Sequence, residues 1–364
     1  MASRIMLLAG AVVVAAVSAC GDGNSSKVST PPPSGNGAEV VILDLGTVDL
    51  TPANQDQTFD VGVSNATSLV LVADGGNATD IDIDQIVAPN GATLVTPDPG
   101  DTNPLTGSVS PQEVGGSVAT AIIPSVTASF TQGDYTFSVG SFNAAGTRVA
   151  ATVRLTAIVN HRIPSAPGVL PVRVFFVGTP GLNAGNAATS IAFQKIVQQM
   201  RLAFGAAGID LQLVDFVDID GQIGTELAVL DVLDATTDRI VPDVNLNRQS
   251  DEMDRLFALS GGRGDRVINV FFVREFFTQS GVVAVSGGAP GPSIISGTAH
   301  SGIAASTLDG LDQQSDADLE HLGHDLEVEI ARYLGALGTI DPDDFTAAQQ
   351  TQMLRNPAVV SPTP

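Results

Sequence analysis

The stretch LGHDLEVEIARYLGALG, residues 322–338, decides how the second half of this chain folds. At 100° per residue, its large apolar side chains and one leucine just upstream fall on a narrow stripe of a helix. The stripe comprises Leu319, Leu322, Leu326, Ile330, Tyr333, Leu334 and Leu337. The opposite face carries His321, His324, Val328, Arg332 and Gly335. The spacing predicts a helix over residues 317–338, with an apolar back that faces a core and a distinct front that lines a cleft.

Outward from this helix, strands and helices alternate. The predicted strands cover 172–178, 209–219 and 266–276. The predicted helices cover 187–208, 250–261 and 346–355. Because runs of buried-strand character alternate with runs of helical spacing, residues 172–364 are predicted to form an α/β or α+β domain.

The preceding residues, 38–160, have a different pattern. They hold short β-branched runs that Gly, Asn, Pro and Asp interrupt about every dozen residues, which predicts an antiparallel β-sandwich. In the run DIDID, Asp80, Asp82 and Asp84 are expected on its solvated face, with the isoleucines pointing inward. A Pro-rich join over 161–171 separates the two predicted domains.

The first residues carry an export signal. Arg4 precedes an apolar run, Ile5–Val17, that is too short to span a membrane, and VSAC follows. Small residues before a cysteine resemble the bacterial lipobox. The resemblance implies a signal peptide over 1–19, cleavage before Cys20 and a lipid on its sulfur. Gly, Ser, Asn and Pro dominate the residues after Cys20, which predicts a flexible linker over 20–37. The alternative is an ordinary signal peptide with a chance cysteine.

Charge restricts the partners. The formal net charge is −23, and this repels phosphate backbones, so we expect no nucleic-acid partner. The expected location is extracytoplasmic in a bacterial cell envelope, with the membrane as a partner through the lipid. Cys20 is the single cysteine, so no disulfide can form within the chain.

The helix front resembles a zinc site. In the zincin pattern H-E-x-x-H-x-x-G-x-x-H, two histidines one turn apart and a third beyond the glycine bind zinc, and the glutamate activates water. Aligned to it, Val328, Arg332 and Gly338 take the histidine positions. Glu329 takes the glutamate position and Gly335 the glycine position. The helix is similar to the active helix of secreted metzincin-type peptidases of the pappalysin-like kind.

Flanking stretches extend this resemblance to about 190 residues. VSGGAPGPSIISGTAHSGIAAS (285–306) resembles the segment before the zinc helix of related bacterial lipoproteins, and FTAAQQTQMLRNPAVV (345–360) their final helix and tail. In the first domain, SLVLVADGGNATDIDIDQIVAPNGATLV (68–95) followed by FTQGDYTFSVGSF (130–142) resembles the small jelly-roll domains that flank secreted bacterial peptidases. The resemblance therefore implies a zincin-like second domain.

The chemistry of a zincin is nevertheless missing. Valine has no lone pair to donate, glycine has no side chain, and arginine stays protonated, whereas a catalytic zinc needs three protein ligands. We therefore expect no zinc or other cofactor and a vestigial Glu329 that pairs with Arg332. The methionine expected beneath the zinc is absent too, because the later Met353 lies in the last predicted helix.

Two relocated sites remain open. His321 and His324, with Asp325, form a candidate metal site one turn upstream. Ser286, in AVSGG, approximates the nucleophile elbow G-x-S-x-G, which needs a strand before it and a helix after it.

Three functional hypotheses follow. The first is a non-catalytic relative of a metallopeptidase that binds peptide or protein in the old cleft. The second is an active hydrolase or peptidase that uses a relocated site. The third is a structural surface protein without a ligand, in which residues 317–338 are an ordinary amphipathic helix. A cleft filled by side chains would support it.

Overall fold

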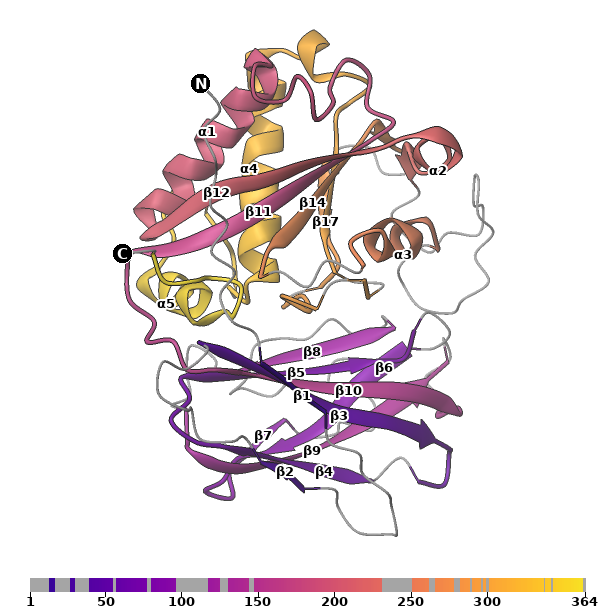
Figure 1. Ribbon diagram of the computed structural model, residues 1–364, viewed down its shortest axis with the longest axis vertical. Helices are drawn as coiled ribbons and strands as arrows, with labels where there is room; N and C mark the ends of the chain where they lie inside the picture. The colour runs from indigo at the N-terminus through magenta and orange to yellow at the C-terminus, as the bar shows by residue number, and fades with distance from the viewer. Residues whose placement is uncertain are drawn as a thin grey trace.

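The computed structural model describes most of the chain (Figure 1). The described residues are 13–16, 27–29, 39–54, 57–76, 80–95, 117–124, 130–143, 147–230, 251–261, 266–277, 282–288, 290–295, 297–298, 301–336, 338–341 and 343–362. Cys20 and Leu337 lie outside them, so the predicted lipobox stays a prediction. Within these residues, no helix is long and apolar enough to cross a membrane.

The first domain is a β-sandwich of two five-stranded sheets, as predicted. The first sheet has the order β1-β3-β10-β5-β8 and the second has the order β2-β4-β9-β6-β7. The bounds are β1 Val13–Ala16, β2 Lys27–Ser29, β3 Val40–Leu50, β4 Thr58–Val63, β5 Ser68–Asp74, β6 Asp80–Val87, β7 Thr93–Val95, β8 Val118–Ile123, β9 Gly133–Phe142 and β10 Ala151–Asn160. All pairings are antiparallel except β1 with β3 and β2 with β4. Inward-facing side chains of both sheets share one apolar core.

The acidic run in β6 does not lie on a solvated face. Asp82 and Asp84 are only 8% and 6% exposed. Their pairing with β9 is irregular between Asp82 and Gln85, and Arg148 closes over Asp84 at 3.1 Å. The expectation of solvated aspartates was wrong because a distant arginine and a local irregularity of the ladder override the simple alternation.

The second domain is built on a mostly parallel sheet with the order β12-β11-β14-β17-β16. Strands β11 Gly168–Val177, β12 Ile209–Ile219, β14 Ile268–Val273 and β17 Ile303–Ser306 are parallel, and the edge strand β16 Ala284–Ser286 is antiparallel to β17. The remaining elements are β13 Val229–Leu230, β15 Glu275–Phe276, α1 Ile191–Ala206, α2 Gly221–Glu226, α3 Asp251–Ala258, the 3-10 turn Leu311–Gln313, α4 Asp316–Tyr333 and α5 Ala347–Arg355. The α+β class and its helices and strands thus agree with the sequence expectation.

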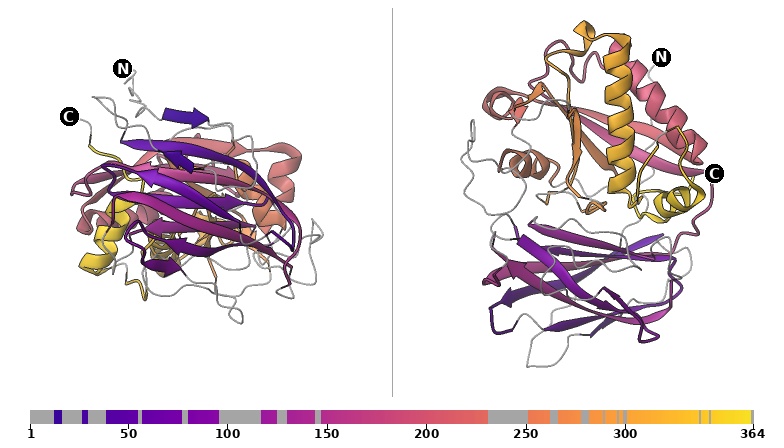
Figure 2. Two further views of the ribbon diagram at one scale, coloured as in Figure 1. Left: turned by 90° about the horizontal axis from the view of Figure 1, so that it is seen from below. Right: turned by 180° about the vertical axis from the view of Figure 1, so that it is seen from behind.

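Helices cover both faces of this sheet (Figure 2). Alternate side chains of the central strands explain this: Phe176 and Phe272 face the cluster that holds α1 and α4, whereas Phe175 and Phe271 face α3. Both faces are buried, and the strands therefore read as continuous apolar runs in the sequence.

The domain boundary differs slightly from the predicted join over 161–171. Strand β11 already begins at Gly168 and includes Pro171. Its pairing with β14 starts only at Val172, whereas it pairs with β12 from Gly168 on. A proline is tolerated at 171 because its missing N–H falls after the Val169–Val360 bridge and before the pairing with β14 begins.

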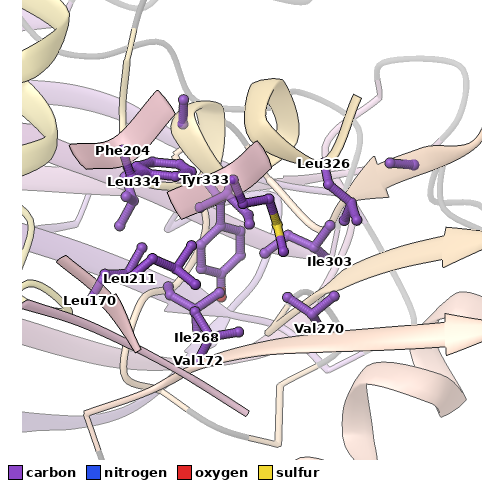
Figure 3. Close-up of a cluster of buried hydrophobic side chains, with 14 of the residues drawn as sticks. Leu170, Val172, Phe204, Leu211, Ile268, Val270, Ile303, Leu326, Tyr333 and Leu334 are labelled. Carbon is purple, nitrogen blue, oxygen red and sulfur yellow. The ribbon is translucent and has the colours of Figure 1, made fainter. Parts of the chain in front are cut away.

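Helix α4 is positioned by its ends and by its apolar stripe. Ser315 and Asp318 form a capping box at its start. It ends at Tyr333, before the predicted 338, because Gly335 takes a positive φ of 94° and the Ala336 N–H donates back to the Ala331 carbonyl. The described stripe residues are buried against the sheet: Leu326, Tyr333 and Leu334 pack on residues of β11, β12, β14 and β17 (Figure 3).

A short segment holds the two domains together. Residues 354–360, which we call the junction segment, comprise the last two residues of α5 and the five that follow it, and they lie between the sandwich and the second domain. The Arg355 carbonyl accepts from Ser68 and Asn160, both of the sandwich, at 2.8 and 2.9 Å. Arg266, which precedes β14, donates to the Pro357 carbonyl at 2.8 Å and to Glu39 at 2.9 Å. Sandwich residues such as Val70 and Ile158 also belong to the core cluster that holds α1 and α4, so the junction is both apolar and hydrogen-bonded.

Candidate functional site

The site that the sequence predicted lies where α4 crosses the edge strand β16. The Glu329 side chain is 14% exposed, and its carboxylate accepts three hydrogen bonds. Arg332 Nη1 donates to Oε1 at 2.6 Å. Ser286 donates to Oε2 twice, from its backbone N–H at 3.0 Å and from its hydroxyl at 2.6 Å. The predicted Glu329–Arg332 pair is therefore present, and the structure adds a partner 43 residues away in sequence.

The vestigial ligand positions have ordinary structural roles. Val328 is partly buried against the core. Arg332 is the exposed member of its ion pair, at 46%. Gly335 reverses the chain after α4, and Gly338 is exposed with φ 76°. Hence the one charged group beside Glu329 at these positions is the Arg332 guanidinium, which pairs with the carboxylate.

Ser286 is not placed as a nucleophile. A strand precedes it, but the described residues from Gly287 to Gly310 contain no helix, so the predicted elbow is wrong. The prolines at 290 and 292 are one physical reason. The N–H groups that would stabilise an oxyanion are also occupied, because Ser286 N–H binds Glu329 and Gly287 N–H binds the Gly302 carbonyl at 2.9 Å.

The two histidines of α4 do not converge. His321 Nε2 lies 3.8 Å from Asp325, whereas His324 Nδ1 lies 3.4 Å from Glu327. In the part of the chain that the structure describes, no three His, Cys, Asp or Glu side chains are grouped as metal ligands. Burial raises the pKa of Asp325. His300 lies outside the described residues. Because His321 and His324 contact different carboxylates, the described residues do not form the predicted His321–His324 metal site.

Glu327 is the functional candidate that the sequence analysis missed. Its side chain is 1% exposed, and neither carboxylate oxygen has a hydrogen-bond partner among the described residues. Burial, helped by the negative charge of Asp343, raises the pKa of Glu327 to about 8. The feature of the sequence that could have indicated this burial is Gly323, one turn before Glu327 on α4. A Cβ at Gly323 would overlap the Gln199 side chain of α1, so this side of the helix is packed closely.

Comparisons with known proteins do not extend this description. The sequence matches no protein family profile and no curated protein. Among solved structures, a Bacillus subtilis structural-genomics protein is 13% identical, with 63% of this chain and 64% of that chain covered and a TM-score of 0.18. A carbohydrate esterase family 2 enzyme with a carbohydrate binding domain, from Corynascus thermopiles (Myceliophthora fergusii), is 16% identical, with 59% and 58% covered and a TM-score of 0.12.

A salicylyl-acyltransferase from a tetracycline biosynthetic pathway is 13% identical, with 57% of this chain and 46% of that chain covered and a TM-score of 0.12. The chain thus spans about half to two thirds of the length of these proteins. TM-scores this low do not establish a shared fold.

Proposed function

We propose that this chain is a lipid-anchored, extracytoplasmic protein whose second domain is a degenerate zincin that binds a peptide or protein without hydrolysing it. The observation that carries the proposal is the occupied carboxylate of Glu329. A catalytic glutamate must hold a water beside a metal. Here Arg332 and both donors of Ser286 take its two oxygens instead.

The arrangement of the residues aligned with the zincin pattern supports the proposal that the site once bound a metal. Val328, Glu329 and Arg332 lie on the helix that crosses the antiparallel edge strand β16, and Gly335 turns the chain directly after that helix. The Ser286 and histidine arrangements described above favour the non-catalytic form over a hydrolase with a relocated site.

Binding is proposed on the exposed part of Arg332. One of its nitrogens is used by Glu329, while 46% of the side chain contacts solvent, so it can donate to a peptide carbonyl or carboxylate. The test is the anisotropy of a fluorescein-labelled tryptic digest of casein. We expect Arg332→Ala to abolish binding, whereas Arg154→Ala, at an exposed arginine of the sandwich, leaves it unchanged. No binding to the wild type, or equal loss in both variants, would favour the structural hypothesis.

Placing histidines at two of the three ligand positions tests the alignment with the zincin pattern. The double variant Val328→His/Arg332→His creates H-E-x-x-H, with both imidazoles on one face of α4. We expect the wild type to purify without bound zinc. The double variant has two of the three ligands of a catalytic zinc, so after incubation with excess zinc it should retain more zinc than the wild type by elemental analysis.

The single variant Val328→His is the matched control, and a melting curve verifies that each variant folds. Stoichiometric zinc in the wild type, together with peptidase activity, would overturn the non-catalytic proposal. Zinc content no higher in a folded double variant than in the single variant would contradict the zincin alignment.

The anchor is tested separately. We expect Cys20→Ser, expressed in a bacterium, to lose incorporation of labelled palmitate and to leave the membrane fraction, whereas Ser18→Ala keeps both. Incorporation that persists in Cys20→Ser would contradict the lipobox. A form cleaved before Cys20 lacks β1, which would leave β3 paired with β10 alone.

A further inference from the structure

The carboxyl group of Glu327 is buried between α4 and its neighbours without a compensating bond. Neither oxygen is hydrogen-bonded within the described residues, although burying a charged carboxylate costs several kcal/mol unless it is paired. The fold therefore accommodates the neutral acid and penalises the anion.

Among the ionisable groups around Glu327, only His324 lies close enough to pair with the anion, and it does so only as the protonated imidazolium. On α4, His324 Nδ1 lies 3.4 Å from Oε2, outside good hydrogen-bond geometry. On α1, Lys195 binds Asp316 and Arg201 donates to the Leu211 carbonyl. Strands β16 and β17 carry no ionisable side chain.

The remaining neighbour is the α4–α5 connection, residues 334–346. It contributes Asp341, Asp343 and Asp344, and the charge of Asp343 acts directly on Glu327. The connection also packs on α1, because the Phe345 ring lies 5.7 Å from that of Phe204. Because the charge of Asp343 raises the pKa of Glu327, ionised Glu327 is expected to repel this segment.

The α4–α5 connection is coupled to the domain junction. It leads into α5, which carries one ionisable side chain, Arg355. At the end of α5, the carbonyls of Leu354 and Arg355 accept from Arg162, Asn160 and Ser68 on the sandwich side. Asn356 also donates to the Leu334 carbonyl at 3.1 Å, which ties the junction segment to the end of α4.

We propose that Glu327 and the α4–α5 connection form a proton-controlled clasp on the domain junction. While Glu327 carries its proton, the connection packs against α4 and the junction segment holds the two domains together. When Glu327 loses that proton to solvent, its carboxylate and Asp343 repel each other, the connection opens, and the junction loosens. The device does not depend on the proposed peptide binding.

The test is amide hydrogen exchange in residues 338–356 at pH 6 and pH 8, corrected for the intrinsic pH dependence of exchange. In the wild type we expect protection there to fall by about tenfold or more, since one pKa unit corresponds to a factor of ten. Glu327→Gln, which is neutral at both pH values, should show no such fall. Glu320→Gln, at an exposed glutamate of α4, should behave as the wild type does.

Three results would overturn the clasp. The first is unchanged protection in the wild type, and the second is an equal fall in Glu327→Gln. The third is a fall in residues 338–356 no larger than the fall shown by the slowest-exchanging amides of both domains, because it would mean that Glu327 affects global stability alone. If Glu327→Gln fails to fold, Asp343→Asn is the second variant, and it should reduce the fall by removing the repelling charge.

Discussion

Replacing Glu327 by glutamine is expected to flatten the decline in stability between about pH 4.5 and pH 8. The folded protein keeps the proton of Glu327 up to its raised pKa of about 8, whereas the unfolded chain releases it above the ordinary glutamate pKa of 4.5. The stability that the neutral acid allows is therefore fully present below pH 4.5 and is lost as the pH rises to 8. The variant should gain about 1.4 kcal/mol on the wild type for each pH unit in this window.

Urea denaturation of the wild type, Glu327→Gln and Glu320→Gln at several pH values measures this difference. Because the slopes of unfolding free energy against pH are compared, any pH-independent cost of burying the glutamine amide cancels. Glu320 is exposed on the same helix, so its variant should follow the wild type. Parallel stability curves for all three proteins would mean that Glu327 is ionised, and so compensated, in the folded state.

The second large effect is expected at Arg266. Its side chain is 7% exposed, and it donates to Glu39 and to the carbonyls of Pro357 and Val359. Arg266→Met keeps the length of the side chain but leaves these acceptors without their donor. Glu39 is itself 31% exposed, so the loss comes mainly from the buried carbonyls left without a donor, and it amounts to about 2–3 kcal/mol. Denaturation in urea should show that loss, with the two domains unfolding less cooperatively.

Arg154→Met is the matched control. The Arg154–Asp44 pair has a similar separation, 2.9 Å, but its members are 63% and 32% exposed. An exposed pair contributes at most about 1 kcal/mol, so this variant should unfold nearly as the wild type does. Equal losses in the two variants would contradict the role given to Arg266 at the junction.

The sequence predicted the elements whose signal is local. The stripe of α4, the strand at 209–219 and the short runs of the sandwich follow periods of 3.6 or 2 residues, and the structure has them. The Glu329–Arg332 pair was predictable because side chains three residues apart on a helix are neighbours. The end of α4 was placed too late, since a glycine cap depends on hydrogen bonds that periodicity does not encode.

Long-range contacts were beyond such reasoning. Nothing in AVSGG indicates that Ser286 meets Glu329, because the register of β16 brings them together. The burial of Glu327 depends in the same way on how closely α1 packs against α4. The environment of Asp84 is likewise set by Arg148, 64 residues further along the chain.

The junction segment has a consequence for how the protein is made. A chain leaves the ribosome, or crosses a membrane, from its first residues onward, and domains tend to fold in that order. Residues 354–360 emerge only after every strand of both domains, so the sandwich and the parallel sheet are complete before the segment that ties them together exists. Each domain must therefore wait with an apolar surface uncovered, and chaperones have that interval in which to bind it.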